Sequence, residues 1–121
     1  ARLPWSNKHQ ANFKRLAASL GLNAHLFPSR PEDFGNWKLE WRKLVGWVKA
    51  LPKPAGVVAC YDIRGQYVLD ACREAGIDVP GELAVIGQHN DELLCELCLP
   101  PLSSVIPDAV TAGWQAAAML N

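Results

Sequence analysis

The chain has 121 residues, half of them hydrophobic and a fifth charged, which is the composition of one small globular domain. Twelve Lys and Arg residues balance twelve Asp and Glu residues, so the chain lacks the basic surplus that attracts nucleic acid. No apolar run approaches the roughly 20 residues of a membrane-spanning helix, and no signal-peptide pattern is visible. If the protein touches DNA, we expect the contact surface to lie outside this chain.

The first residue is not Met and the last segment stops inside a helical pattern, so we expect a fragment of a longer protein. Its cysteines do not have the spacing of a small secreted disulfide scaffold. They are Cys60, Cys72, Cys95 and Cys98. We therefore expect reduced thiols and a cytoplasmic location.

An amphipathic helix is the first element that the sequence predicts. Either Ser6 or Asn7 is expected to cap it, apolar residues then recur at helical spacing as far as Leu20, and Gly21 ends it. The segment 23–27, NAHLF, then predicts a short strand.

A loop is expected over 28–36 because of its Pro, Gly and polar content, and a second amphipathic helix over 37–50. Pro52 stops that helix. The segment 55–62, AGVVACYD, is almost continuously apolar, as expected of a strand buried on both faces in a parallel sheet. A helix over 65–75 follows.

The remaining elements continue the alternation of strands and helices. Gly76 closes the preceding helix as a C′ residue, and 83–87 is the next buried strand. A further strand is expected over 102–106 and a final helix over 108–120. This alternation predicts an α/β fold in which βαβ units build a parallel sheet with right-handed crossovers.

Three segments carry a family pattern. The first is KPAGVVACYDIRGQYVLDACREAGIDVPGELAVIGQHNDE, residues 53–92, in which an apolar strand ends in a polar residue plus Asp, and VIG precedes acidic residues. PPLSSV with the following helix, and the opening HQANFKRLAASLG, are the others. In order and spacing these segments resemble the effector domains of LacI/GalR-type transcription regulators. Within that family they resemble xylose-operon regulators, which also carry an AraC-type DNA-binding domain.

The resemblance covers nearly the whole chain and implies one parallel-sheet βαβ lobe of a two-lobed, periplasmic-binding-protein-like (type I) fold. Residues 1–107 would form the C-terminal lobe, and 108–121 a crossover helix that packs on a first lobe outside this chain. The resemblance implies a sensor that binds a monosaccharide such as xylose between its lobes. It also implies a homodimer, DNA contact through another domain, no cofactor and no membrane contact.

Polar and aromatic residues gather where the start of the first helix and two strand ends are expected to converge. In open α/β sheets, ligands bind beyond the carboxyl ends of the strands. Planar polar groups can bond sugar hydroxyls, and an aromatic ring can cover the C–H face of a sugar. The candidate ligand-binding residues are Trp5, His9, Tyr61, Asp62, Arg64, Gln88, His89 and Asn90.

Two of these positions depart from the family pattern. The family's sugar-binding Arg falls on His9, and its sugar-binding Asp falls on His89. Arg and Asp hold hydroxyls with a permanent charge and two-pronged geometry, which a neutral His lacks. Either the sugar differs from the usual pentose, or this lobe binds weakly.

Other roles stay open for the candidate residues. Asp62 could contact the sugar or cap the following helix, and Arg64 could pair with a surface carboxylate. His9 could be a solvated or capping side chain. Trp5 could simply be exposed near the chain end.

Cys95 and Cys98 form a CxxC pair that invites a redox or zinc interpretation. Structural zinc needs four ligands, and a redox CxxC opens a helix, whereas this pair ends one. We therefore expect no metal site. Because no catalytic motif is present either, we expect a binding domain rather than an enzyme. The alternative functions are a periplasmic sugar-binding protein of a transport system and, from another class, a thiol oxidoreductase that uses Cys95 and Cys98.

Overall fold

The computed structural model describes residues 4–27 and 35–120. Helices and strands alternate through most of this part of the chain. In chain order they are α1 (Pro4–Ser19), α2 (Trp37–Ala50), β1 (Ala55–Val58), α3 (Asp62–Ala75), β2 (Leu83–Gln88), α4 (Glu92–Leu97), β3 (Ser103–Val105) and α5 (Ala109–Met119).

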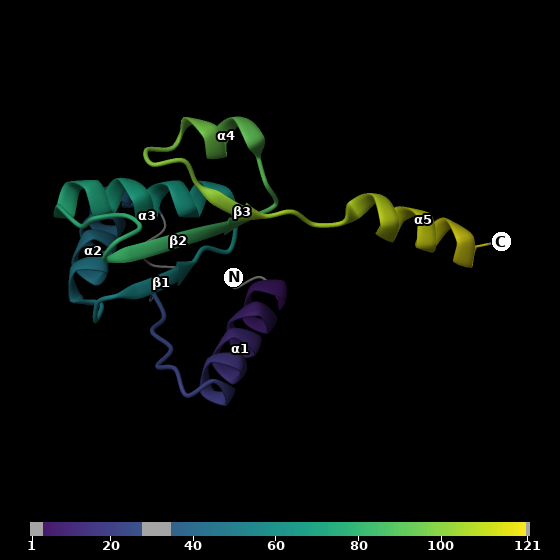
Figure 1. Cartoon of the computed structure of the whole chain (residues 1–121), viewed down its shortest axis with the longest axis horizontal. Coiled ribbons are helices and arrows are strands. Elements are labelled where there is room, and N and C mark those ends of the chain that lie inside the picture. Colours follow the sequence, from purple (N-terminus) through teal and green to yellow (C-terminus); the bar gives the residue numbers. More distant parts are fainter. Residues whose placement is uncertain (1–3, 28–34, 121) are drawn as a thin grey trace.

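The three strands form a parallel sheet in the order β1-β2-β3, which confirms the predicted α/β fold (Figure 1). Val57 pairs with Val85 and Ile86 pairs with Ser103 in register. The connections run through α3 and α4. Because all three strands point the same way, their carboxyl ends lie at one edge of the sheet, called here the carboxyl edge.

The main core lies between one face of the sheet and the helices α2 and α3. Val48 and Leu83 are completely buried there, and Cys72 is 1 % exposed. Two polar contacts reinforce the packing of α2 on α3. Trp41 Nε1 donates to Glu74 Oε2 at 2.6 Å, and Arg64 Nη1 donates to Glu40 Oε1 at 3.1 Å.

A second, smaller core lies under α4, where four side chains pack together: Leu69, Cys95, Cys98 and Leu102. Leu102 also approaches α3 so closely that a Cβ atom on Gly65 would lie 2.7 Å from its Cδ2. A larger residue at this point of α3 would therefore force the Leu102 side chain to shift. The two cores together hold α3 against β2, the central strand of the sheet.

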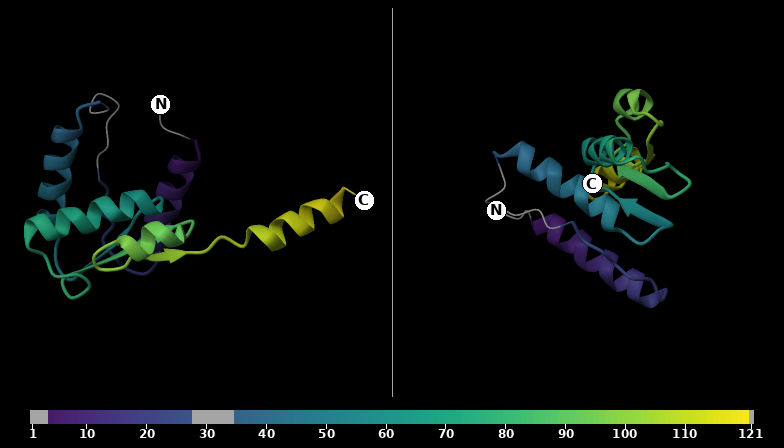
Figure 2. Two further views of the ribbon diagram at one scale, coloured as in Figure 1. Left: turned by 90° about the horizontal axis from the view of Figure 1, so that it is seen from above. Right: turned by 90° about the vertical axis from the view of Figure 1, so that its left-hand side faces the viewer.

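The opposite face of the sheet is more open than the sequence predicts. Val58 is 51 % exposed, and Gly56 and Ala84 are also exposed. Helix α1 lies on this side but buries only Ala17 (Figure 2). The prediction that both faces of the 55–62 strand are buried was thus wrong, because its apolar composition does not show how closely a helix covers each face.

The structure also corrects the predicted start of α1. The helix includes Pro4, so Ser6 and Asn7 lie inside it and do not cap it. Proline fits a first helical turn because its missing N–H has no helical partner to lose there. Gly21, with φ 69°, follows the helix as expected.

Residues 23–27 were predicted as a strand, and this was wrong. They join none of the three described strands. The Phe27 ring instead packs on Trp47 of α2, with centroids 5.6 Å apart. Apolar anchoring without a backbone ladder explains the strand-like composition. Most of the predicted 28–36 loop lies outside the described residues.

Other boundaries differ by a few residues. β1 ends at Val58 rather than at position 62, and α3 begins at Asp62 rather than at Gly65. Gly76, with φ 70°, forms the predicted C-terminal cap of α3. α2 occupies the predicted residues, and Asn36 caps it by accepting from the Leu39 N–H at 3.2 Å.

Helix α5 projects away from the rest of the chain (Figures 1 and 2). Its first turn is capped by Asp108, whose side chain accepts from the Thr111 N–H at 3.1 Å. Every residue from 105 to 120 is exposed, including Trp114 at 77 %. The helix predicted over 108–120 is therefore confirmed, but it buries no apolar face against the described part of the chain.

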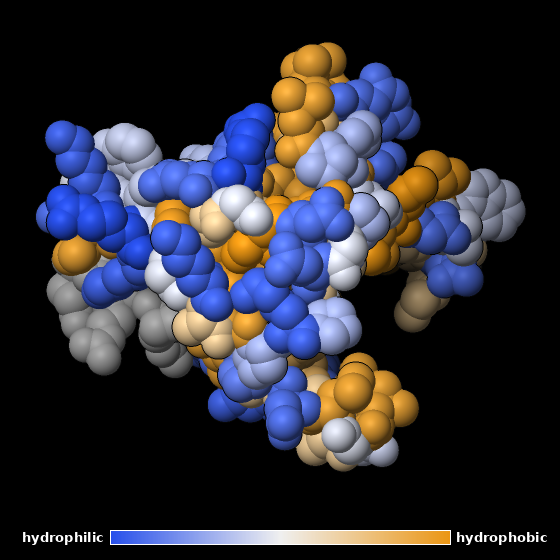
Figure 3. All heavy atoms as spheres, turned by 60° about the vertical axis from the view of Figure 1, so that its left-hand side comes forward, coloured by the Kyte–Doolittle hydropathy of each residue, from blue (hydrophilic) through white to orange (hydrophobic). Residues whose placement is uncertain are grey.

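Helix α4 also carries exposed apolar side chains, because Leu93 and Leu97 are each 70 % exposed (Figure 3). In the described ranges, no helix is both long enough and apolar enough to cross a bilayer.

Candidate ligand-binding site at the carboxyl edge

The start of α1 and the end of β1 meet at the carboxyl edge. The Trp5 ring lies 6.5 Å from the Tyr61 ring and 5.8 Å from the His9 ring, measured between centroids. Trp5 is 40 % exposed, and Tyr61 is partly exposed. The three rings thus form one aromatic cluster with accessible faces.

The turn that follows β2 contributes the polar part of this edge. His89 and Asn90 both have positive φ angles, 89° and 57°, in the left-handed region that residues other than glycine rarely adopt. Such a conformation persists only where surrounding contacts enforce it.

Three consecutive backbone amides supply those contacts. The His89 N–H donates to the Val105 carbonyl at 3.0 Å, and the Asn90 N–H donates to Ser104 Oγ at 3.0 Å. The Asp91 N–H donates to Asp62 Oδ2 at 2.7 Å. The turn is therefore held through its main chain by β3 and by the start of α3.

The side chains of this turn and of Gln88, the last residue of β2, take little part in these contacts. His89 is exposed, while Gln88 and Asn90 are partly exposed. Within 4–27 and 35–120, none of these three side chains makes a hydrogen bond to another residue. They are available to a ligand at the carboxyl edge.

Asp62 is the buried member of the candidate set, with 3 % of its surface exposed. Its Oδ2 accepts from the Asp91 N–H at 2.7 Å, and its Oδ1 accepts from Ser104 Oγ at 2.5 Å. The capping alternative was wrong. Tyr61 occupies the N-cap of α3 without a side-chain cap bond, and the Asp62 carboxylate bonds instead to groups beyond β2 and in β3.

Arg64 forms an ion pair with Glu40 of α2, which supports the ion-pair alternative. Its guanidinium bonds Glu40 at 3.1 Å and lies 5.7 Å from the Tyr67 ring centroid. Burial lowers the pKa of Arg64, but its hydrogen bond with Tyr61 and the Glu40 charge outweigh burial and raise that pKa overall. The Arg64 side chain remains partly exposed.

Sequence reasoning missed two residues of this edge, Ser104 and Gly87. Ser104 links the Asn90 N–H to Asp62, and a Cβ atom on Gly87 would lie 2.2 Å from Asp62 Oδ1. The VIG motif was visible as a strand end, but its glycine gave no sign that a carboxylate packs on it. Ser104 appeared only as part of an ordinary strand.

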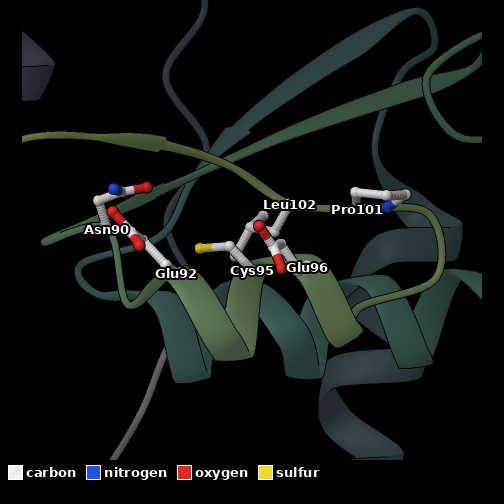
Figure 4. Close-up of a pocket in the computed structure, with 6 residues that line it drawn as sticks. All are labelled: Asn90, Glu92, Cys95, Glu96, Pro101 and Leu102. Atoms are coloured by element: carbon white, nitrogen blue, oxygen red, sulfur yellow. The ribbon is translucent and has the colours of Figure 1, made fainter.

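A shallow hollow of about 200 Å³ lies between α4 and the segment before β3 (Figure 4). It is lined by Asn90, Glu92, Cys95, Glu96, Pro101 and Leu102. Neither Trp5 nor Tyr61 lines it, so it is not the predicted sugar cleft. Its wide opening also leaves little surface to enclose a ligand.

The CxxC pair is buried, and neither cysteine forms a disulfide. Burial is the main cause that raises the pKa of Cys95 and of Cys98, and nearby carboxylates raise both further. A reactive cysteine needs the opposite shift. Among the described residues, no three His, Cys, Asp or Glu side chains are grouped to hold a metal ion.

Comparison with known proteins places these features in a family context. Residues 1–121 match the periplasmic binding protein-like domain family. The xylose operon regulatory protein of Haemophilus influenzae is 35 % identical over 117 residues, and that of Escherichia coli K12 is 32 % identical over 117 residues. Each alignment covers 97 % of this chain but only 30 % of the relative.

Two solved structures share the fold. A xylose-binding transcription activator superposes with a TM-score of 0.77 at 31 % identity, covering 97 % of this chain and 31 % of the activator. A transcriptional regulator in complex with cellobiose superposes with a TM-score of 0.62 at 22 % identity, over 84 % of this chain and 31 % of the regulator. This second similarity supports the fold alone.

Proposed function

We propose that this chain, which belongs to the periplasmic binding protein-like domain family, is a sugar-sensing lobe of a transcription regulator. Relatives above 30 % identity are xylose operon regulatory proteins, which favours regulation over the transport alternative. By these names the relatives are regulatory proteins. The chain spans about a third of their length, so the ligand, the partners and the regulatory output are part of the proposal.

One observation carries the proposal. The Trp5–Tyr61 aromatic cluster and the polar turn 88–90 both belong to the carboxyl edge of one parallel sheet. An accessible aromatic ring can cover the C–H face of a sugar while neutral polar groups bond its hydroxyls. Such a mixture is typical of sites for uncharged polar ligands.

The binding residues follow from this arrangement. Trp5 and Tyr61 would stack on the sugar, and His9, Gln88, His89 and Asn90 would bond its hydroxyls. Each such bond contributes roughly 0.5–1.5 kcal/mol, and micromolar affinity requires about 8 kcal/mol. Several bonds are therefore needed, and a second lobe is the natural source of the remainder.

The proposed mechanism is closure of two lobes on a monosaccharide such as xylose. Residues 1–107 form the C-terminal lobe, and 108–121 cross to the first lobe. The exposure of α5 supports this division because its apolar surface has no partner in the described chain. A sugar that binds the closed arrangement better than the open one shifts the population between them.

We place the output of this closure in a homodimer that contacts DNA through a separate AraC-type domain, and therefore in the cytoplasm. The chain itself has no net charge with which to attract DNA. The sugar signal would reach the DNA through movement of one lobe against the other.

A titration of the full-length protein that carries this chain tests the function. D-xylose, D-ribose, L-arabinose, D-glucose and cellobiose are compared by calorimetry. We expect one monosaccharide to bind, and Trp5→Ala to weaken its binding roughly tenfold or more by removing the stacking surface. Trp37→Ala is the matched control, because Trp37 is 67 % exposed and pairs with Trp41 on α2.

The same titration with His89→Asp tests the effect of a histidine at the position where the family pattern has a sugar-binding Asp. Restoring a charged, two-pronged acceptor is expected to tighten pentose binding if the parent ligand is a pentose. No binding of any sugar by the parent protein, together with DNA binding that sugars do not change, would contradict the proposed function.

A further inference from the structure

We propose that Asp62 is a positioning residue that shapes the 88–91 turn and does not itself contact the ligand. This inference rests on the proposed function, because the shape of the turn affects sugar affinity only if the sugar binds at the carboxyl edge. It assigns to Asp62 a role different from the ligand contact that its place after β1 predicts.

The burial of Asp62 is the first argument. Its side chain is 3 % exposed, whereas His89 is exposed at the surface of the same edge. Both carboxylate oxygens already accept hydrogen bonds, at 2.7 Å from the Asp91 N–H and at 2.5 Å from Ser104 Oγ. Each oxygen keeps a second lone pair, but the burial means that a ligand hydroxyl would have to displace the protein groups that cover the carboxylate in order to reach it.

The second argument is the identity of the groups that Asp62 holds. Ser104 lies on β3, and its hydroxyl oxygen also accepts from the Asn90 N–H at 3.0 Å. Asp62 thus bonds the Asp91 amide directly and the Asn90 amide through Ser104. Both amides belong to the turn in which His89 and Asn90 have positive φ angles.

The third argument is the absence of a side chain at position 87. A Cβ atom there would lie 2.2 Å from Asp62 Oδ1 and 3.2 Å from its Cα, so only glycine lets the start of α3 approach β2. Gly87 itself is buried. The close approach brings the carboxylate under the turn.

The expected consequence for binding is indirect. With the carboxylate in place, the turn is ordered before the ligand arrives, so binding does not bear the entropic cost of ordering it. Without it, two hydrogen bonds are lost and the left-handed residues lose a restraint. Gln88, His89 and Asn90 then sample positions that cannot all meet the sugar.

Four variants of the full-length protein test this role: Asp62→Ala, Asp62→Asn, Ser104→Ala and the control Asp70→Ala. Asp70 is on the same helix, and its carboxylate pairs with Arg73, which is exposed. Asparagine keeps one acceptor for the Asp91 N–H, and its amide can donate to Ser104 Oγ, which has a second lone pair. It should therefore preserve most of the network.

Two readouts are compared, the affinity for the sugar found by titration and the hydrogen exchange of peptides covering 87–92. We expect Asp62→Ala to raise exchange in that peptide and to weaken sugar binding roughly 10- to 100-fold, as for two lost hydrogen bonds. Ser104→Ala should do the same to a lesser extent. Asp62→Asn should restore most of both properties, and Asp70→Ala should leave both unchanged.

The outcomes separate the inference from the proposed function. Equal loss of affinity in Asp62→Ala and Asp62→Asn, with exchange of 87–92 unchanged, would show a direct ligand contact and overturn the positioning role. If the parent binds no sugar, the proposed function fails, while the exchange data still decide whether Asp62 orders the turn. If Asp62→Ala unfolds the protein, Asp62→Asn and Ser104→Ala supply the same comparison.

Discussion

Helices α3 and α5 have similar lengths and opposite surroundings. α3 buries six of its residues, Asp62, Gly65, Val68, Leu69, Ala71 and Cys72. α5 has no charged residue and is rich in apolar ones, yet buries none. Apolar composition thus predicts that a helix has a partner, but not that the partner is in the same chain.

The difference also separates two sources of helix stability. α3 is held by tertiary packing on both cores, which is the usual source in proteins. α5 has 11 residues and depends on its own hydrogen bonds and the Asp108 cap. Isolated helices shorter than about 12–15 residues are marginal in water.

The largest expected difference in the free energy of unfolding is between two Leu→Ala substitutions, one beside α3 and one beside α5. Leu83 is completely buried under α3, and Leu120, just after α5, is 89 % exposed. Leu83→Ala should lower the free energy of unfolding by about 2–5 kcal/mol, and Leu120→Ala by less than about 0.5 kcal/mol. Urea denaturation of the 121-residue chain measures both. Similar losses would show that α5 packs on the chain in solution.

Glycine substitutions should give effects of opposite sign. Gly87→Ala forces a Cβ against Asp62 and should destabilise the fold by about 1–3 kcal/mol. Nothing lies within 4 Å of a Cβ on Gly113, in the middle of α5, so Gly113→Ala should favour the helix by up to about 1 kcal/mol. Urea denaturation measures the first effect and carbon chemical shifts the second. A stabilising Gly87→Ala would contradict the close approach of α3 to β2.

The smallest expected effect is a pH dependence confined to α5. The hydrogen bonds that Asp108 accepts from Thr111 lower its pKa below the usual 3.8. A depressed pKa means that the stabilisation is complete above the unfolded value and disappears as the pH falls through the folded one. We expect α5 helicity, followed by NMR, to decrease as the pH falls below about 4.

Asp108→Asn is the control for this titration, because asparagine caps a helix about as well and does not titrate. Its α5 helicity should stay constant across the same pH range. A loss of helicity with the same midpoint in both proteins would assign the transition to another group.

Sequence reasoning identified the helices and the parallel sheet because periodic apolar residues and glycine or proline boundaries are local signals. It failed for residues 23–27, where Phe27 packs on Trp47 without joining a ladder. It located the aromatic and polar residues of the carboxyl edge. It missed the network beneath them, because Asp62 bonds partners 29 and 42 residues away. Such contacts leave no periodic trace.

The main-chain support of the 88–91 turn has a consequence for how ligand preference can change. Backbone amides fix its shape, whereas the side chains of His89 and Asn90 take no part in that support. Those side chains are therefore interchangeable in a way that Asp62, Gly87 and Ser104 are not. We therefore expect point replacements at positions 89 and 90 to change ligand preference without altering the backbone of the turn, which the His89→Asp variant tests.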